Sequence, residues 1–281
     1  NIADLSTDGC FTLGCAVGAM LTIAGHPILA LFAAMAAGML SGYVTAFLQT
    51  RLGVESILAG IISNTGLYTI NLAVMGFSSN VSITGVDTVF SLFKGLVGGQ
   101  WSRLILLALI AAVLVLVLIR FFGTSIGLSI RATGDSLDMV SASSINPKAT
   151  ITIGLCLANA LTALSGCLIG EYNKFCDINL GTGMVTIALA SLIIGEVFAG
   201  RRGSVGKRVV CVVLGSIVYR FIIALALRLN ISAEYFKLVS AVIVAVAIAA
   251  PNMKDYVHLA KIKSNARKLR ALSGKGDETD A

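Results

Sequence analysis

The sequence predicts an all-α membrane protein, a polytopic helical bundle of about eight spans, some of them discontinuous. Hydrophobic residues make up 57% of the 281 residues and charged residues only 12%, about half the charged share of a soluble domain. The stretch Ser102–Phe122 is almost uncharged and about as long as the roughly 20 apolar residues that cross a bilayer core. A helix that is apolar on every side is either buried or spans a membrane.

Apolar segments recur along most of the chain and give the expected spans. They are Gly9–Ala24, Ile28–Leu48, Ser56–Met75, Ser102–Phe122, Thr150–Gly170, Met184–Ala199, Val209–Leu227 and Lys237–Ala250. The first, sixth and eighth are short, as half-helices are. The Gly/Thr-rich lead-ins DLSTDGCFTLG and NLGTGM predict breaks in the first and sixth. We expect a transmembrane domain over residues 1–251 and a basic tail over residues 252–281.

The basic residues are distributed unevenly between the two sides of this topology. Fifteen Lys and Arg lie in the tail and in the loops on its side, against five on the opposite side. The positive-inside rule therefore places the C-terminal tail and the segment Gly123–Ala149 in the cytoplasm. The same rule accounts for the net charge of +7, so no nucleic-acid partner is expected.

Several chemical signatures are missing from the sequence. The two histidines, His26 and His258, are far apart, and neither HExxH nor G-x-x-x-x-G-K-[ST] occurs. Five of the six cysteines lie in apolar segments and are expected to act as small hydrophobic residues, whereas Cys176 lies in an outer loop without an evident partner, and no CxxC occurs. No metal site, no ATP site and no catalytic centre are predicted, and no histidine is placed to activate a serine in a span.

Polar residues form a stripe on each of two spans. The stripes are Asn64, Tyr68 and Asn71 in the third span and Asn159, Thr162 and Ser165 in the fifth. They fit either interhelical hydrogen bonds or the polar lining of a solute path. Glu196 and Arg220 are the costly charges within spans, but their depths do not match, so no ion pair between them is expected.

Small residues also recur at helical spacing. The sets are Gly14 and Gly18, then Ala34, Gly38 and Gly42, then Gly166 and Gly170. Such spacing lets helix backbones approach closely. It predicts a compact bundle and does not distinguish a transporter from other membrane proteins.

The cytoplasmic segment Gly123–Ala149 is longer than a turn between two spans requires. A short helix is expected over Asp135–Ser144, capped by Asp135 or Ser136 and ended before Pro147. Its apolar side holds Leu137, Met139, Val140 and Ala142, and Asp138 lies in its first turn. By itself this pattern fits a surface loop whose helical turn lies against its own bundle.

The motif R-A-T-G-D-x-x-x-M-x-x-x-x-x-I-N over residues 131–146 resembles the cytoplasmic coupling loop of bacterial ABC importer permeases of the branched-chain amino acid and ribose type. The opening D-L-S-T-D-G-C-F-T-L-G and the I-I-G-E at Ile193–Glu196 resemble the branch paired with tryptophan- or tyrosine-type binding proteins. The resemblance runs from Asp4 to about Pro251. Members of this family carry one more span before the opening motif, so an upstream span is expected to be missing here.

This resemblance implies a transport mechanism that depends on partners. Two permease copies, expected to be a homodimer in the bacterial cytoplasmic membrane, would form the path for an amino acid or similar small polar solute. A binding protein would deliver the solute outside, and separate ATPase subunits would bind the ATP, so the chain needs no cofactor. The breaks near Gly9–Phe11 and Gly181–Met184 would line the path. The ATPase would dock through Asp135, Leu137, Asp138, Met139, Val140 and Ala142.

Other functions remain open at this level. A permease of the same family could carry a sugar or nucleoside. An ion-coupled secondary transporter is disfavoured because no inverted repeat and no buried set of acidic ligands is evident. A membrane scaffold or receptor is disfavoured because its outer loops would be short and the polar stripes would have no role.

Overall fold

The computed structural model describes residues 4–99, 101–143, 145–200, 204–228 and 242, and the chain divides into two units, residues 1–185 and 186–281. Within the described residues, five helices are long and apolar enough to cross a membrane. They are α2 (Pro27–Thr50), α3 (Ser56–Val74), α5 (Ser102–Phe122), α8 (Pro147–Asn173) and α10 (Val205–Arg228). Two shorter apolar helices join them, α1 (Thr7–Ile23) and α9 (Met184–Ala199). The predicted all-α membrane fold is confirmed.

Seven of the predicted spans correspond to these helices, and the borders of α5 and α9 are those expected from the sequence. Helix α8 is longer than predicted because Asn146 caps it and Pro147 occupies its first position, where the fixed φ of proline suits a helix start. The expected eighth span, Lys237–Ala250, and the tail over residues 252–281 lie outside the described residues.

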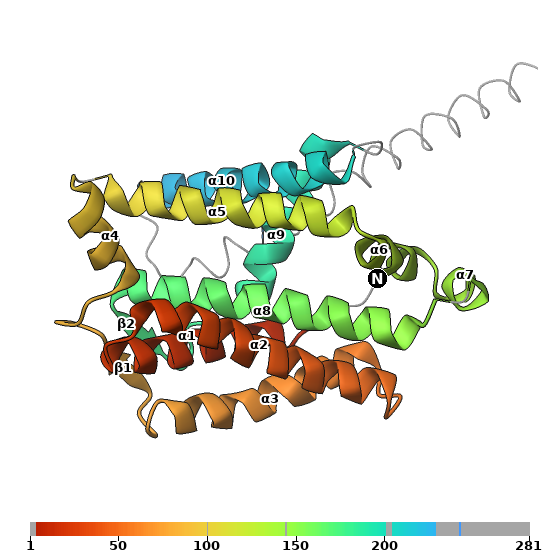
Figure 1. Ribbon diagram of the computed structural model, residues 1–281, viewed down its shortest axis with the longest axis horizontal. Helices are drawn as coiled ribbons and strands as arrows, with labels where there is room; N and C mark the ends of the chain where they lie inside the picture. The colour runs from red at the N-terminus through yellow and green to blue at the C-terminus, as the bar shows by residue number, and fades with distance from the viewer. Residues whose placement is uncertain (1–3, 100, 144, 201–203, 229–241, 243–281) are drawn as a thin grey trace, which may run out of the picture. The chain divides into compact units, whose positions relative to one another are not determined.

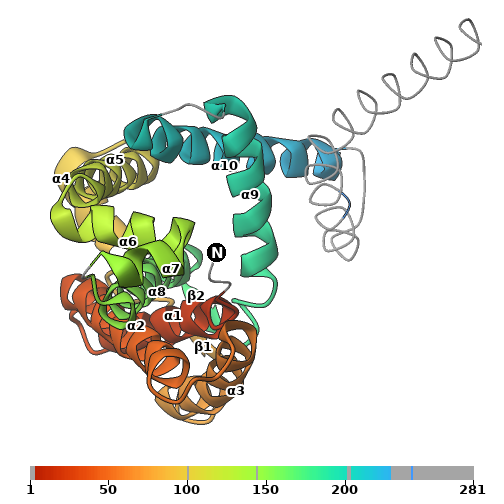
Figure 2. The same ribbon diagram turned by 90° about the vertical axis from the view of Figure 1, so that its right-hand side faces the viewer.

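The core of unit 1 forms where α1 packs against α2, α3 and α8, as Figure 2 shows in a view along the bundle. Gly14 of α1 lies on the backbone of Ala163, and Gly166 of α8 lies on the carbonyl of Phe11. On α2, Gly42 faces the carbonyl of Leu155, and a Cβ there would come within 2.6 Å of that oxygen. The small-residue stripes are therefore contact seams between helices, as their spacing predicts.

Unit 2 is built on a second seam of the same kind. A Cβ added to Gly195 of α9 would lie 2.6 Å from the Cα of Val212, and Gly215 of α10 lies against the backbone of Ser191. The two helices thus pack closely in antiparallel directions. Glu196 and Arg220 are both exposed.

Helix α5 shows the opposite behaviour, with only Ser102 and Leu106 buried along its whole length. Ile110 and Leu114 pack against the core cluster beside Leu106, and most of the other side chains of the apolar run are exposed. An apolar surface of this kind suits the acyl chains of a bilayer or another apolar helix.

The segment between α3 and α5 is more elaborate than the short outer loop expected from the sequence. It contains β1 (Asn80–Ser82) and α4 (Val89–Val97). Strand β1 pairs antiparallel with β2 (Phe175–Asp177), with Val81 opposite Cys176. These elements lie at one end of the bundle, and α6 (Ser125–Asp135) and α7 (Leu137–Ala142) lie at the other (Figure 1).

Glu171 anchors α4 to the rest of this end. Its side chain is only 1% exposed. One carboxylate oxygen accepts a hydrogen bond from the Thr22 hydroxyl (3.1 Å), and the other accepts one from the backbone N–H of Val89 (2.8 Å). Val89 is the first residue of α4, so the carboxylate satisfies a helix-end amide that has no partner within its own helix. Sequence reasoning missed Glu171 because it treated the end of this span as a boundary.

The Glu171–Val89 hydrogen bond can be tested with a double-mutant cycle. Glu171→Leu leaves the amide buried and unpaired, which is expected to lower the free energy of unfolding by about 1–3 kcal/mol. Val89→Pro removes the same N–H at a position where proline is tolerated. The double variant leaves no unpaired N–H. Its loss in free energy of unfolding should therefore be smaller than the sum of the losses in the two single variants. Thermal unfolding of the purified protein measures all four variants of the cycle, and strict additivity would contradict the assignment.

Candidate functional site

The first turn of α1 lies opposite the middle of α8. The two helices run in parallel, since Cys10 bonds to the carbonyl of Asn159 (3.3 Å) and Thr22, twelve residues later, bonds to Glu171. Asn159 is the thirteenth of the 27 residues of α8. If α8 crosses the bilayer, α1 begins near the middle of the membrane and reaches one side only. The predicted break at the start of the first span stays a prediction, since residues 1–3 lie outside the described residues.

Asp8 joins the start of α1 to the start of α9. Its carboxylate accepts hydrogen bonds from the backbone N–H groups of Gly183 and Val185, both at 2.9 Å. The first amides of a helix lack partners within the helix, and a carboxylate at this position is also favoured by the helix dipole. Asp8 thus supplies acceptors for residues at the start of α9 while lying in the first turn of α1.

Thr12 reinforces the same connection one turn later. Its hydroxyl accepts a hydrogen bond from the N–H of Gly181 (3.1 Å) and donates one to the carbonyl of Asp8 (3.2 Å). Gly181 lies so close to that carbonyl that a side chain at this position would collide with it. Glycine at residue 181 is therefore needed for the chain before α9 to lie against the start of α1.

Asp4 forms the third part of this arrangement. One of its carboxylate oxygens accepts from the N–H (2.8 Å) and hydroxyl (2.6 Å) of Ser6, and the other accepts from the amide of Asn159 (2.8 Å). Together, Asp4, Ser6, Asp8, Thr12, Asn159 and residues 181–185 form what we term the polar junction. It gathers polar groups beside the middle of an otherwise apolar bundle.

Three of the six predicted path residues lie around the start of α1. Asn159 belongs to the polar junction. Asn71, which is 1% exposed, donates to the carbonyl of Gly9 (3.0 Å). Asn64 is half-buried, and its side-chain oxygen faces Gly9. Polar groups from the third and fifth spans therefore lie together near the start of α1, which is compatible with the polar stripes seen in the sequence.

The other three predicted path residues lie elsewhere. Tyr68 is 52% exposed on the outer side of α3. The hydroxyls of Thr162 and Ser165 bond to carbonyls of their own helix, those of Ala158 (2.9 Å) and Thr162 (2.7 Å). Back-bonding of this kind satisfies a hydroxyl locally and needs no partner across the bundle.

A groove between α2 and α3 is unsuited to a polar solute. It has a cavity volume of about 560 Å³ between α2 and α3, with α1 as its floor. Its lining is apolar apart from Ser41 and Ser63, and Ser63 already accepts a hydrogen bond from Thr45 (2.9 Å). A polar solute would find few hydrogen-bonding partners there, so the polar junction remains the candidate site.

The segment predicted to dock a partner contains two helices where one was expected. Helix α6 ends at Asp135, and α7 begins at Leu137, capped by Ser136, whose hydroxyl accepts from the N–H of Met139 (3.4 Å). The predicted helix Asp135–Ser144 was therefore too long, and Asp135 is not its cap; Ser144 lies outside the described residues. The extended backbone of Ser136 separates the two helices.

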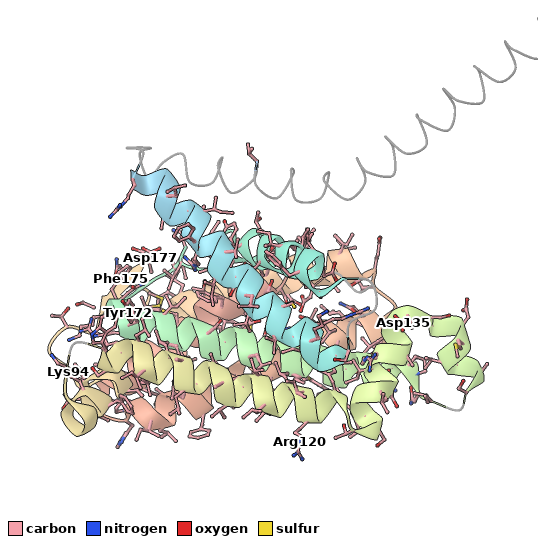
Figure 3. All side chains as sticks on the ribbon, turned by 90° about the horizontal axis from the view of Figure 1, so that it is seen from above. Lys94, Arg120, Asp135, Tyr172, Phe175 and Asp177 are labelled. Carbon is pink, nitrogen blue, oxygen red and sulfur yellow. The ribbon has the colours of Figure 1, made fainter. Side chains whose placement is uncertain are left out.

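The side chains of α7 divide into an anchored and an exposed set. Val140 is 2% exposed, so it holds α7 to its own bundle and is not available to a partner. Met139 is 71% exposed, and Leu137, Asp138 and Ala142 are exposed with it. Figure 3 shows Asp135 at the end of the bundle opposite Lys94, Tyr172, Phe175 and Asp177.

Comparison with known proteins agrees with this architecture. Residues 1–248 match the model of a family described as the permease component of branched-chain amino acid transport systems. A tyrosine transport system permease protein from Clostridioides difficile (strain R20291) is 30% identical over 276 residues, 98% of this chain and 89% of that protein. An uncharacterized protein, RP368, from Rickettsia prowazekii (strain Madrid E) is 29% identical over 91% of this chain and 90% of its own length. No solved structure gives a significant match.

The described residues include five helices that are long and apolar enough to cross a membrane, which defines the class as a multi-pass membrane protein. The chain belongs to the permease-component family of branched-chain amino acid transport systems. It is a transport permease, and the family resemblance expected from the motifs at residues 4–14, 131–146 and 193–196 is confirmed.

Asp8 offers a direct test of the polar junction. Asp8→Ala is expected to leave the amides of Gly183 and Val185 without acceptors. The state in which these amides are protected from exchange is then destabilised by about 1–3 kcal/mol per amide. Hydrogen exchange of the peptide covering residues 181–185 should therefore speed up, while exchange over α7 stays unchanged. Asp138→Ala, an exposed acid on α7, is the matched control. Unchanged protection at residues 181–185 in the Asp8→Ala variant would show that the carboxylate does not hold this segment.

Proposed function

We propose that this chain is the membrane-spanning permease subunit of an ATP-binding-cassette importer that carries an amino acid or similar small polar solute inward. The observation that carries the proposal is the polar junction, in which Asp4 and Asp8 bind backbone and side-chain groups beside the middle of α8. Irregular backbone at membrane depth is tolerated where it is buried in protein or lines a cavity. Family membership and the likeness to a tyrosine transport permease support the same function.

The partners follow from the same proposal. A second copy of the permease completes the path, a solute-binding protein delivers the solute on the outer side, and separate ATPase subunits bind the ATP. The chain itself then needs no cofactor. The protein lies in the bacterial cytoplasmic membrane among its lipids, with the C-terminus in the cytoplasm. The excess of basic residues on that side supports this orientation.

An ion-coupled transporter that holds its cation through carboxylates needs carboxylates that are free of other donors. The polar junction does contain two acids, Asp4 and Asp8, which the sequence had not identified as a pair. Three donors already occupy Asp4 and two occupy Asp8. These bonds fit a role in holding backbone better than a role as ion ligands.

Transport by reconstituted proteoliposomes tests the proposed function. With the ATPase subunit and binding protein present, uptake of tyrosine, tryptophan or a branched-chain amino acid should require ATP hydrolysis. It should persist when ionophores collapse the proton and sodium gradients. Uptake driven by a gradient without ATP would establish the ion-coupled alternative, and ATP-driven uptake of a sugar or nucleoside alone would identify a different solute class.

The exposed face of α7 is the proposed contact with the ATPase. Replacing Leu137 and Met139 together with Asp should abolish co-purification of the ATPase, because two charges would replace the apolar contact area, while Val140 still anchors the helix. Leu92→Asp, an exposed leucine on α4 at the opposite end, is the matched control and should keep the ATPase bound. Full recovery of the ATPase with the double variant would exclude α7 as the docking element.

A further inference from the structure

A cleft opens between the end of α2 and the start of α8. Its cavity volume is about 380 Å³, and both Arg51 and Lys148 line it. The helices touch at Gly42 and Leu155, but towards this end the facing residues are larger, and Tyr43 and Phe47 border the space between the helices. Helix α8 begins at the end of the bundle that carries α6 and α7 (Figure 1).

The polar groups of this cleft leave two cationic donors for a ligand. The hydroxyls of Thr50 and Thr152 donate to carbonyls of their own helices, at 2.7 and 2.8 Å. The side-chain oxygen of Asn146 accepts the amides at the start of α8. Among the described residues no acidic residue lines the cavity, so Arg51 and Lys148 border it without a carboxylate among these walls. A ligand for this cleft must carry negative charge and oxygen acceptors.

The walls of the cleft change character along the helices. Arg51 and Lys148 lie at its outer end, whereas Tyr43, Phe47 and Ile153 continue along α2 and α8 towards the middle of the bundle. Tyr43 and Phe47 are both exposed. The cleft therefore presents positive charge at the membrane surface and apolar area at the depth of the acyl chains. A free phosphate ion would satisfy the cations but would make no use of the aromatic wall.

We propose that this cleft binds an anionic phospholipid of the cytoplasmic leaflet. Arg51 and Lys148 hold the headgroup phosphate, and Tyr43 and Phe47 contact an acyl chain. Basic clefts between spanning helices on the cytoplasmic side are suited to such headgroups. The distribution of basic residues supports a cytoplasmic location for the end of the bundle that carries this cleft. The assignment does not depend on the solute or on the energy source of transport.

Native mass spectrometry of the purified permease tests the site, with phosphatidylglycerol and phosphatidylcholine as the added lipids. Neutralising each cation, by Arg51→Gln and by Lys148→Gln, should weaken phosphatidylglycerol binding roughly fivefold per charge and leave phosphatidylcholine binding unchanged. Phe47→Ala should also weaken phosphatidylglycerol binding, through lost acyl contact. Arg120→Gln in the last turn of α5 is the matched control, since it removes the same charge on the same side outside the cleft. Thermal unfolding in detergent verifies that each variant is folded.

Three outcomes would overturn the proposal. Wild-type affinity for phosphatidylglycerol in the Arg51→Gln, Lys148→Gln double variant would show that the cleft does not hold the lipid. An equal loss in Arg120→Gln would show that only the general surface charge matters. Competition by millimolar inorganic phosphate, with no effect of Phe47→Ala, would identify a free anion as the ligand of the two cations.

Discussion

A helix that begins within the bilayer must find partners for its first amides in the protein, because hydrocarbon offers none. In this permease Asp8 meets the requirement for the start of α9, and Asp4 ties the residue before α1 to the middle of α8. Asp8 accepts from Gly183 and Val185, and Asp4 accepts from Ser6 and Asn159. Without Asp8, the amides of Gly183 and Val185 would lose their acceptor, and without Asp4 the residue before α1 would lose its link to Asn159 of α8. The position of the polar junction follows from this constraint.

Helix α8 connects the functional regions of unit 1. Near its first turn, Thr150 hydrogen-bonds to Thr133 of α6 (2.9 Å), the helix that leads into α7. Asn159 binds Asp4 at its middle, and Glu171 binds the first amide of α4 near its end. A continuous helix is stiff, so a displacement at one of these contacts is carried to the other two. This geometry gives a physical route between the end that carries α6 and α7, the junction, and the end that carries α4.

Close packing lets α8 hold these contacts in register. Glycines on both helices allow α1 to lie against α8 at backbone distance, and Gly42 does the same for α2. Dispersion contacts and buried polar pairs, more than hydrophobic burial, stabilise helices against one another in lipid. Beyond Gly42 the facing side chains are larger. There α2 and α8 are separated by the cleft that Arg51 and Lys148 line.

The sequence by itself determined the membrane class, the positions of seven of the eight expected spans, and the family. Those properties follow from apolar run length, charge asymmetry and short motifs, all of which are local in the chain. It also identified Asn64, Asn71 and Asn159 as polar groups within spans. What only the tertiary structure decided was pairing: that Asp8 serves residues 183 and 185, that Glu171 holds α4, and that Val140 is buried while Met139 is exposed. The hydrogen-bonded partners are separated by tens to more than a hundred residues in the chain. Val140 and Met139 differ only in which side of their helix meets the bundle. Helical periodicity predicts which residues share a face, but it does not predict what that face contacts.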